Sequence, residues 1–195
     1  MDTETLFDLA TNECKEVFIS KFQEYGPSWR LLRVSALCDR IFTKVARIRR
    51  LEELGGAGKV EDSIESEFIG IANYAILVLD RLGNEGLSWP GLDSLVPARW
   101  ANLNDGTLAY GRVIDRAKEL LLAKNHDYNE AWRHILLSTF TDEILSRTLR
   151  VRELMSVESI DISSVDAQLV DVLNYSALAL VRIRYDESSV CDAMN

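Results

Sequence analysis

The sequence predicts an all-α protein, a tandem-duplicated helical bundle. Three observations predict this fold class: apolar residues recur at intervals of three and four, no segment alternates as a half-buried strand does, and the second half of the chain repeats the first. A shift of 103 positions (128 minus 25) places Tyr25 under Tyr128, and nine of ten matched pairs in this register are identical. The tenth pair exchanges one cation for another, Lys44 for Arg147. We therefore expect two copies of one helical unit.

The other matched pairs extend across the middle of each copy. They are Trp29 and Trp132, Arg30 and Arg133, Ser35 and Ser138, Asp39 and Asp142, Ile41 and Ile144, Arg47 and Arg150, Arg49 and Arg152, and Leu51 and Leu154. After a deletion of two residues the match resumes, with Asn73-Tyr74 under Asn174-Tyr175. The register therefore holds through most of each unit.

The first predicted helix carries apolar residues at three- and four-residue intervals between Leu6 and Phe22. Thr3 is its predicted N-cap, because a threonine hydroxyl can accept from a backbone N–H of the first turn. Gly26 followed by Pro27 is predicted to end the helix, since proline cannot continue it.

The second and third helices differ in their apolar pattern. Ser28 is the predicted cap of helix two, whose narrow apolar stripe predicts an amphipathic helix that stops at Gly55. Helix three, from about residue 62 to 82, is apolar on nearly every side, which is typical of a helix buried in a bundle. The second copy repeats the plan, with helices expected at roughly 105–125, 131–155 and 163–184.

These elements predict two three-helix units, one connecting segment and a C-terminal tail. The predicted segments are copy one at 1–82, a connection rich in Gly, Pro, Asn and Ser at 83–104, copy two at 105–184 and a C-terminal tail at 185–195. We expect the long apolar helices to pack together around a pseudo-twofold axis, so that each copy covers what the other would expose. For assembly two outcomes remain open: the duplication replaces a homodimer, or the protein forms a homodimer of its own.

The amino-acid composition limits the kinds of partner that the protein can bind. A chain of 195 residues with 47% hydrophobic residues can bury a core, and its net charge of −9 argues against binding a DNA or RNA phosphate backbone. No apolar run reaches the roughly 18 residues that span a bilayer, and the N-terminus lacks the apolar region of a signal peptide. Its three cysteines, Cys14, Cys38 and Cys191, indicate neither a disulfide framework nor a zinc site. We expect a cytoplasmic protein that binds neither nucleic-acid polymers nor membranes.

A stripe of cations follows the flank of helix two. Lys44 and Arg47 occupy it in copy one, and Arg147 and Arg150 in copy two. Two interpretations remain. The stripe is a solvated flank whose alkyl stems cover the core edge, or the four side chains bind phosphate, whose geometry guanidinium groups match.

Two aspartates serve another face of the same helix. Asp39 and Asp142 lie about 140° around the axis from Lys44 and Arg147, on a count of 100° per residue. They either face solvent or pair with an arginine on a neighbouring helix.

Polar residues interrupt helix three at positions that share one face. They are Glu67, Gly70, Asn73 and Tyr74 in copy one and Gln168, Asp171, Asn174 and Tyr175 in copy two. Buried polar groups need partners, so one interpretation is that they bond a facing helix and specify the register of the bundle. The other is a pocket between helices, lined by Asn73, Tyr74, Asn174 and Tyr175, in which Glu67 and Asp171 bind a divalent cation.

Aromatic residues mark the junction of helices one and two. Tyr25, Trp29, Tyr128 and Trp132 lie there, and such aromatics are more often core anchors than platforms for a base. A nucleobase nevertheless needs such a face. Trp29, Trp132 and Tyr128 are therefore candidate pocket residues.

The repeated residues resemble a bacterial and phage family, nucleotide modification associated domain 1. The resemblance rests on three motifs and their copy-one versions: Lys124-x-x-Asp127-Tyr128-x-x-x-Trp132-Arg133, then Asp142 with Arg147-x-x-Arg150, then Asp171-x-x-Asn174-Tyr175. It covers nearly the whole chain in two copies. The family is in turn similar to the all-α nucleoside triphosphate pyrophosphohydrolases, which hold Mg²⁺ with carboxylates of E-x-x-E and E-x-x-D helices and release pyrophosphate.

The sequence departs from that enzyme pattern. The E-x-x-D position reads Glu67-x-x-Gly70 in copy one and Gln168-x-x-Asp171 in copy two, so that each copy keeps half. Where those enzymes carry acids on helix two, both copies carry cations.

Three functions follow as hypotheses. In the first, a Mg²⁺-dependent hydrolase binds a nucleoside triphosphate, with Glu67 and Asp171 as catalytic carboxylates and metal ligands and with Lys44, Arg47, Arg147 and Arg150 on the phosphates. The second is a nucleotide-binding module without turnover. The third is a structural helical protein whose cation stripe is only a solubilising flank.

Overall fold

The computed structural model describes residues 1–26, 28–60, 62–85 and 103–185. Among these residues there are α-helices and short 3-10 helices but no strand, so the all-α class is confirmed. The elements are α1 (Thr3–Tyr25), η1 (Ser28–Leu31), α2 (Val34–Glu53), α3 (Ile64–Glu85), α4 (Leu103–Tyr128), η4 (Ala131–His134), α5 (Leu137–Leu154) and α6 (Ile162–Arg184).

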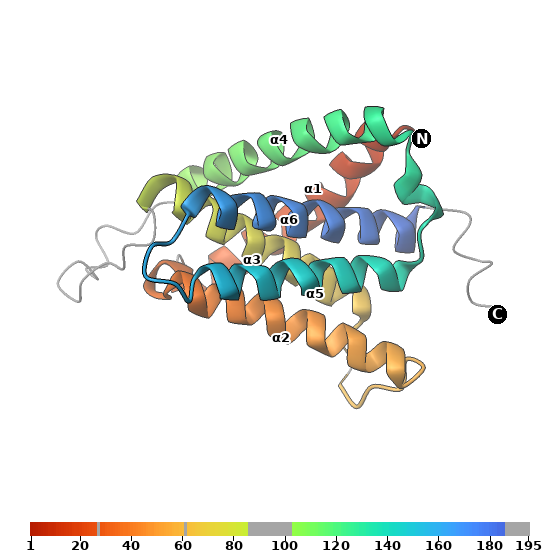
Figure 1. Ribbon diagram of the computed structural model, residues 1–195, viewed down its shortest axis with the longest axis horizontal. Helices are drawn as coiled ribbons and strands as arrows, with labels where there is room; N and C mark the ends of the chain where they lie inside the picture. The colour runs from red at the N-terminus through yellow and green to blue at the C-terminus, as the bar shows by residue number, and fades with distance from the viewer. Residues whose placement is uncertain (27, 61, 86–102, 186–195) are drawn as a thin grey trace.

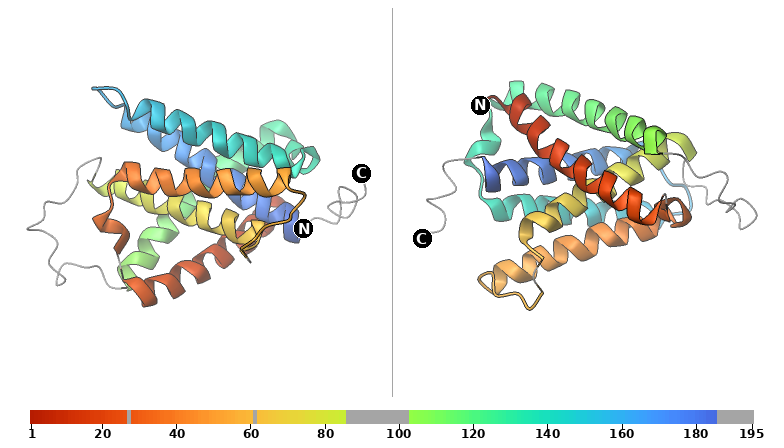
Figure 2. Two further views of the ribbon diagram at one scale, coloured as in Figure 1. Left: turned by 90° about the horizontal axis from the view of Figure 1, so that it is seen from below. Right: turned by 180° about the vertical axis from the view of Figure 1, so that it is seen from behind.

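Each helix of copy one packs against its counterpart in copy two. Helix α3 pairs with α6 in the middle of the bundle, α1 pairs with α4 on one side, and α2 pairs with α5 on the other (Figure 1). The two further views show the α2 and α5 pair and the α1 and α4 pair as separate outer layers (Figure 2). This pairing is the one expected for two copies related by a twofold axis. The pseudo-twofold axis itself stays a prediction.

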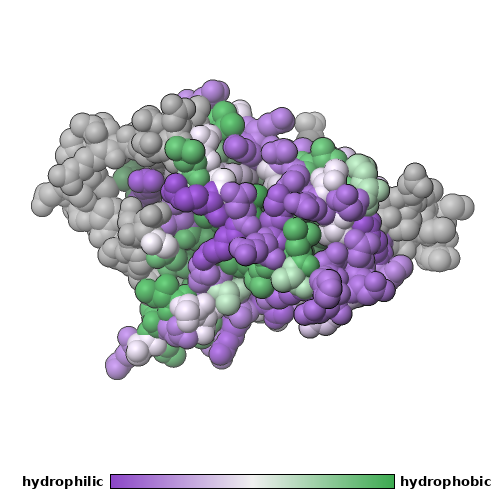
Figure 3. Space-filling view, turned by 90° about the horizontal axis from the view of Figure 1, so that it is seen from above, coloured by the Kyte–Doolittle hydropathy of each residue, from purple (hydrophilic) through white to green (hydrophobic). Residues whose placement is uncertain are grey.

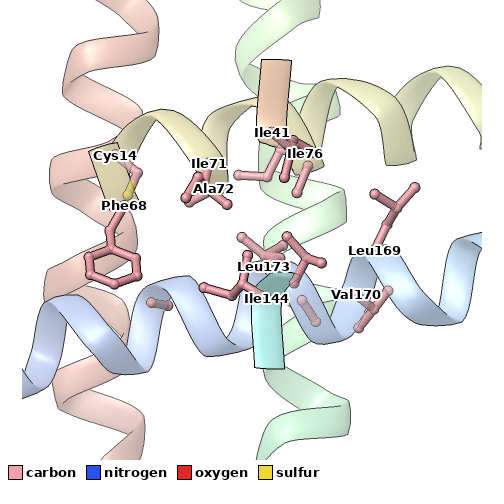
Figure 4. Packing of buried hydrophobic residues seen from close by; sticks show 14 of the residues in the cluster. Cys14, Ile41, Phe68, Ile71, Ala72, Ile76, Ile144, Leu169, Val170 and Leu173 are labelled. Carbon is pink, nitrogen blue, oxygen red and sulfur yellow. The ribbon is translucent and has the colours of Figure 1, made fainter. Parts of the chain in front are cut away.

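The core is centred on α3 and α6, the two helices that are apolar on nearly every side. They run in opposite directions, so that Phe68 at the start of α3 lies toward the far end of α6, and Leu169 near the start of α6 lies toward the far end of α3 (Figure 4). Ile41 of α2 lies beside Ile76 of α3, and Ile144 of α5 lies beside Leu173 of α6 (Figure 4); both isoleucines are fully buried. Burying each such side chain stabilises the fold by about 1.5–3 kcal/mol.

Two predicted helix caps are wrong. The side chain of Asp2 caps α1 by accepting from the Thr5 N–H at 2.7 Å, whereas Thr3 is buried and its hydroxyl donates to Glu130 at 2.5 Å. Ser28 does not cap α2, because it opens the 3-10 helix η1 and α2 begins only at Val34. The same 3-10 turn in copy two, η4, moves the start of α5 from the predicted residue 131 to Leu137.

Two buried arginines hold these 3-10 turns. Arg81 of α3 donates to the carbonyl of Leu32, and Arg182 of α6 donates to the carbonyl of Arg133 at 2.5 Å. Both arginines are almost completely buried, and they occupy equivalent positions of the repeat, 101 residues apart (182 minus 81). A backbone carbonyl in or next to each 3-10 turn therefore has a charged donor, although the two carbonyls, of Leu32 and Arg133, are not at equivalent positions of the repeat.

Crosswise ion pairs join α2 and α5. Arg49 lies 3.6 Å from Asp142, and the equivalent residues Arg152 and Asp39 lie at the same distance. The two aspartates thus pair with an arginine on a neighbouring helix. All four side chains are about half exposed or more, so the pairs contribute little to stability and act mainly on the register of the two helices.

The connecting parts are described only in part. Helix α3 continues to Glu85 and α4 begins at Leu103, so the predicted connection at 83–104 contributes its first and last residues to helices. Its middle and the tail from 186 onward lie outside the described residues. None of the described helices combines the length and the apolar character needed to cross a membrane. The face on the α4 side is mostly hydrophilic, with apolar residues in small separate patches (Figure 3).

Candidate functional site

A cavity of about 500 Å³ lies in copy one, between α1, η1, α2 and α3. Its volume is within the usual range for small-molecule sites. All of its described lining residues lie between Val17 and Leu77, in copy one. Of the sequence-predicted site residues, it brings together Trp29, Lys44, Glu67, Asn73 and Tyr74, and the rest of its lining is Val17, Phe18, Lys21, Phe22, Tyr25, Gly26, Ser28, Asp62, Ser66, Ile69, Gly70 and Leu77.

One side of the cavity is a wall of aromatic rings. Trp29 of η1 packs edge-on against Phe18 with ring centroids 5.7 Å apart, and against Phe22 at 5.5 Å. Trp29 is half-buried, and Tyr25 at the end of α1 is 58% exposed at the rim. This wall offers flat apolar surface to a planar ligand. Aromatic rings pack favourably on other rings in offset or edge-to-face contacts, so an aromatic ligand would be bound well here.

The polar side of the cavity is built on the carboxylate of Glu67. Glu67 is 4% exposed, Lys44 Nζ lies 2.9 Å from its Oε2, and Arg47 donates to its Oε1. Arg47 also donates to the backbone carbonyl of Asp62 at 3.0 Å. A buried charge is tolerated only when it is paired and hydrogen-bonded, and here two cations of α2 compensate one carboxylate of α3.

Gly70 lets Lys44 reach Glu67. A Cβ atom at Gly70 would lie 2.5 Å from Lys44 Cε and 2.8 Å from Cδ, so the lysine stem crosses α3 directly over the glycine. Any larger side chain would displace this stem. The glycine therefore determines where the ammonium group stands.

Asn73 has both ends of its amide occupied. Its Nδ2 donates to the carbonyl of Cys14 at 3.0 Å, and its Oδ1 accepts from the Tyr110 hydroxyl at 2.7 Å. Burial raises the pKa of Tyr110, which keeps its hydroxyl protonated as the donor. Asn73 therefore joins α1, α3 and α4 behind the cavity. The hydroxyl of Tyr74 has no hydrogen-bond partner among the residues that the structure describes.

In copy two a different carboxylate, that of Asp171, pairs with the cations. Asp171 stands at the position of Gly70, Lys124 Nζ lies 2.6 Å from it, and Arg147 Nε lies 3.3 Å from it. Arg147 also pairs with Glu143 at 3.3 Å. Each copy thus keeps one carboxylate of the E-x-x-D motif and surrounds it with two cations. In copy two the carboxylate itself takes the space over which the lysine stem passes in copy one.

Arg150 does not take part in either arrangement. Its side chain is 53% exposed and pairs with Glu153 on its own helix. The reason is its missing partner: Arg47 is drawn to Glu67, and copy two has the uncharged Gln168 at that position. Of the four charged residues Arg147, Arg150, Glu67 and Asp171, which the hydrolase hypothesis combines in one site, only Glu67 is among the described lining residues of this cavity.

The other predicted pocket residues of copy two lie outside this cavity. Trp132 is 8% exposed and its indole donates to the Thr3 hydroxyl at 3.3 Å, so it is a core anchor. Tyr128 is 70% exposed. Asn174 is buried and donates to the carbonyl of Ala117 at 3.1 Å, and Tyr175 packs against Phe140 with ring centroids 6.3 Å apart.

The donor set around Glu67 does not fit Mg²⁺. Such an ion binds through carboxylate oxygens together with water or phosphate oxygens, and it is a cation itself. Glu67 is already shared between Lys44 and Arg47, whose charges would repel a second cation. Within the described ranges no three His, Cys, Asp or Glu side chains form a group that could hold a metal ion.

Sequence reasoning treated Phe18 and Phe22 as ordinary core positions and did not single out Lys21 or Tyr110. A signal was present in the comparison of the two copies. Phe18 and Phe22 align with Leu121 and Asn125 in copy two, so these two positions are aromatic only in the copy that has the described cavity. The contact of Tyr110 with Asn73 could not be found in this way, because it joins different copies.

A family model, described as nucleotide modification associated domain 1, matches residues 21–82 and 124–183, more than half of the chain. The chain belongs to this family. The two matches lie one in each copy, as the tandem duplication requires. The first domain of this nucleotide modification associated domain 1 protein contains all of the described cavity lining from Lys21 to Leu77.

No curated protein and no solved structure matches the chain. The more distant likeness of the family to nucleoside triphosphate pyrophosphohydrolases stays a prediction.

Proposed function

We propose that the protein is a nucleotide-binding module, that the cavity of copy one holds the base of the nucleotide, and that no metal-dependent hydrolysis takes place there. One observation carries the proposal: a wall of aromatic rings faces a neighbouring donor and acceptor, Lys44 and Glu67, inside a cavity of about 500 Å³. The family to which the chain belongs is named for its association with nucleotide modification, which supports the same ligand class.

The aromatic wall supplies the affinity for a base. Every nucleobase has a π-face, and stacking on an aromatic side chain contributes about 1–3 kcal/mol per base in single-stranded complexes. Trp29 is the best placed ring, because it is half-buried against Phe18 and Phe22 and still lines the cavity. Its position is held by the arginine of α3 that fixes the end of η1.

Lys44 and Glu67 supply groups that can bind the edge of a base. An ammonium group has three N–H donors, and the ion pair with Glu67 uses one of them. A carboxylate has about four lone-pair directions, and each oxygen of Glu67 accepts one charged donor. Both residues therefore retain capacity for a ligand. Adjacent donor and acceptor groups match the adjacent carbonyl and amino groups that nucleobases present.

The ion pairs of the cation stripe support a role as a partner of α3 and α6 over the role of an open phosphate-binding fork. In copy one its two cations are held by Glu67, and in copy two Arg147 is held by Asp171 and Glu143. Hydrolysis at phosphorus assisted by Mg²⁺ would need carboxylates that are not already neutralised in this way. These contacts support a binding role.

The proposal is tested by titrating the purified protein with canonical and modified nucleosides and nucleotides in a calorimeter. We expect saturable binding to at least one member of the panel, lost in Trp29→Leu and weakened at least tenfold in Lys44→Ala. The matched control is Arg147→Ala, which removes the equivalent cation of copy two and should leave the affinity unchanged. Far-UV circular dichroism checks that each variant is folded. Absence of binding across the panel, or equal loss in Arg147→Ala, contradicts the proposal.

A further inference from the structure

We infer that the ligand of this cavity is a nucleoside or a nucleoside monophosphate, and that each further phosphate weakens binding. The inference rests on the proposed function and specifies its ligand class. It is carried by the charges that line the cavity and by the partners that those charges already have.

The described charged residues that line the cavity balance each other. They are two lysines, Lys21 and Lys44, and two acids, Asp62 and Glu67. Arg47 adds a fifth charge behind the acids, where it donates to Glu67 and lies 3.8 Å from Asp62. A phosphate monoester carries about −1.5 to −2 charges at pH 7, so a polyphosphate would bring several negative charges to a lining with almost no net charge.

The cations are also engaged with protein groups. Lys21 pairs with Glu24 at 2.9 Å, and Lys44 pairs with Glu67 at the same distance. Arg47 divides its donors between Glu67 and the backbone carbonyl of Asp62. A triphosphate would have to share these cations with the carboxylates that they already neutralise, and any movement of Lys44 toward a phosphate would leave the buried carboxylate of Glu67 with less compensating charge.

Uncharged polar groups are better suited to the remaining ligand surface. Tyr74 lines the cavity and its hydroxyl has no hydrogen-bond partner in the described part of the chain, so it is available to a sugar hydroxyl. Ser28 lines the same cavity beside the aromatic wall and is exposed. Base and sugar therefore meet aromatic rings, hydroxyls and a compensated ion pair, whereas a phosphate chain meets no uncommitted cation among the described lining residues.

The test compares, for each base, the deoxynucleoside, its monophosphate and its triphosphate by calorimetry in EDTA at constant ionic strength. We expect the better of the nucleoside and the monophosphate to bind at least tenfold tighter than the triphosphate. A triphosphate that binds equally well or tighter overturns the inference and leaves the proposed function standing. Absence of binding by all three forms of every base overturns the proposed function itself.

Two variants test the electrostatic cause. Asp62→Asn removes an exposed negative charge from the rim, and Glu67→Gln removes the buried one while keeping its shape. Each should narrow the difference between nucleoside and triphosphate, by about threefold or more. Asp62→Asn remains informative even if Glu67→Gln fails to fold, because the Asp62 side chain is 67% exposed. An unchanged ratio in every folded variant contradicts the inference.

Discussion

The Tyr110 hydroxyl of copy two donates a hydrogen bond of 2.7 Å to Asn73 Oδ1 of copy one. The contact lies behind the cavity. No equivalent hydrogen bond runs from a copy-one hydroxyl to Asn174 of copy two among the described residues. The repeat register aligns Tyr110 with Phe7 (110 minus 103), which has no hydroxyl. Correspondingly, Asn174 Oδ1 is buried without a donor among the described residues, while Asn174 Nδ2 keeps the bond to Ala117 that matches the bond from Asn73 to Cys14.

Removing the Tyr110 hydroxyl should destabilise the protein. In Tyr110→Phe the Oδ1 atom of the half-buried Asn73 loses its donor, and a net hydrogen bond contributes about 0.5–1.5 kcal/mol to stability. Urea denaturation followed by circular dichroism measures the free energy of unfolding. A loss smaller than about 0.5 kcal/mol, the lower end for a net hydrogen bond, would show that the contact is not formed in solution.

Adding a hydroxyl at Phe7 should have the opposite effect. The repeat places this position where a hydroxyl can reach Asn174 Oδ1, so Phe7→Tyr is expected to stabilise the fold by about 0.5–1.5 kcal/mol. Phe7 is fully buried, and the added atom also needs space. The same denaturation experiment applies. Destabilisation by Phe7→Tyr would mean that the two copies differ in packing at this position as well as in side chain.

Gly70→Asp should abolish ligand binding while the protein still folds. The substitution copies the Asp171 arrangement into copy one, and its Cβ atom would displace the stem of Lys44 from α3 toward the cavity. We expect at least a tenfold loss of affinity for any nucleoside that the wild type binds. Gly111→Asp is the matched control, because a Cβ atom there meets nothing within 4 Å. Undiminished binding in Gly70→Asp would refute the position of Lys44 as a ligand group.

Acid should weaken the attachment of the N-terminus to copy two. Hydrogen bonds from Arg133 and then from Thr3 lower the pKa of Glu130 to about 2. A carboxylate with a depressed pKa in the folded state stabilises the protein above its unfolded pKa of about 4.3, and this contribution disappears as the pH falls toward the folded pKa. The free energy of unfolding should therefore decrease between about pH 5 and pH 2.

The matched variant for this pH dependence is Glu130→Gln. It should lower stability at pH 7 and show a shallower decrease between about pH 5 and pH 2, because it has no proton to take up. Thermal unfolding at a series of pH values measures both effects. Identical slopes for the two proteins would assign the acid response to other carboxylates.

Features that depend on residues close together in the sequence were predictable, whereas features that depend on contacts between distant residues were not. Helix number, the buried character of α3 and α6 and the duplication were all predictable, because periodicity and repetition are properties of neighbouring or aligned residues. The caps at Thr3 and Ser28 were wrong because a 3-10 turn and a contact to Glu130 compete for these residues. Such competition depends on residues far away in the chain.

The candidate site was predicted in outline only. Glu67, Lys44 and Trp29 were singled out and do share a cavity, whereas Arg150 and Tyr128 were singled out and face solvent. Arg47 and Arg150 look alike in sequence, since they occupy equivalent positions of the two copies. They differ because an arginine is drawn inward only where a carboxylate stands opposite it, as Glu67 does for Arg47 and Gln168 does not for Arg150.

The amino-acid sequence by itself determined an all-α chain of two related copies, because the spacing of apolar residues selects the helix and the repeat selects the same helices twice. Only the tertiary structure decided that copy one has a cavity whose described lining residues all come from that copy. The physical reason is the size of the side chain at one equivalent position of α3 and α6. A glycine at position 70 leaves room for a lysine stem and an adjacent hollow, and an aspartate at position 171 draws two cations over the equivalent space.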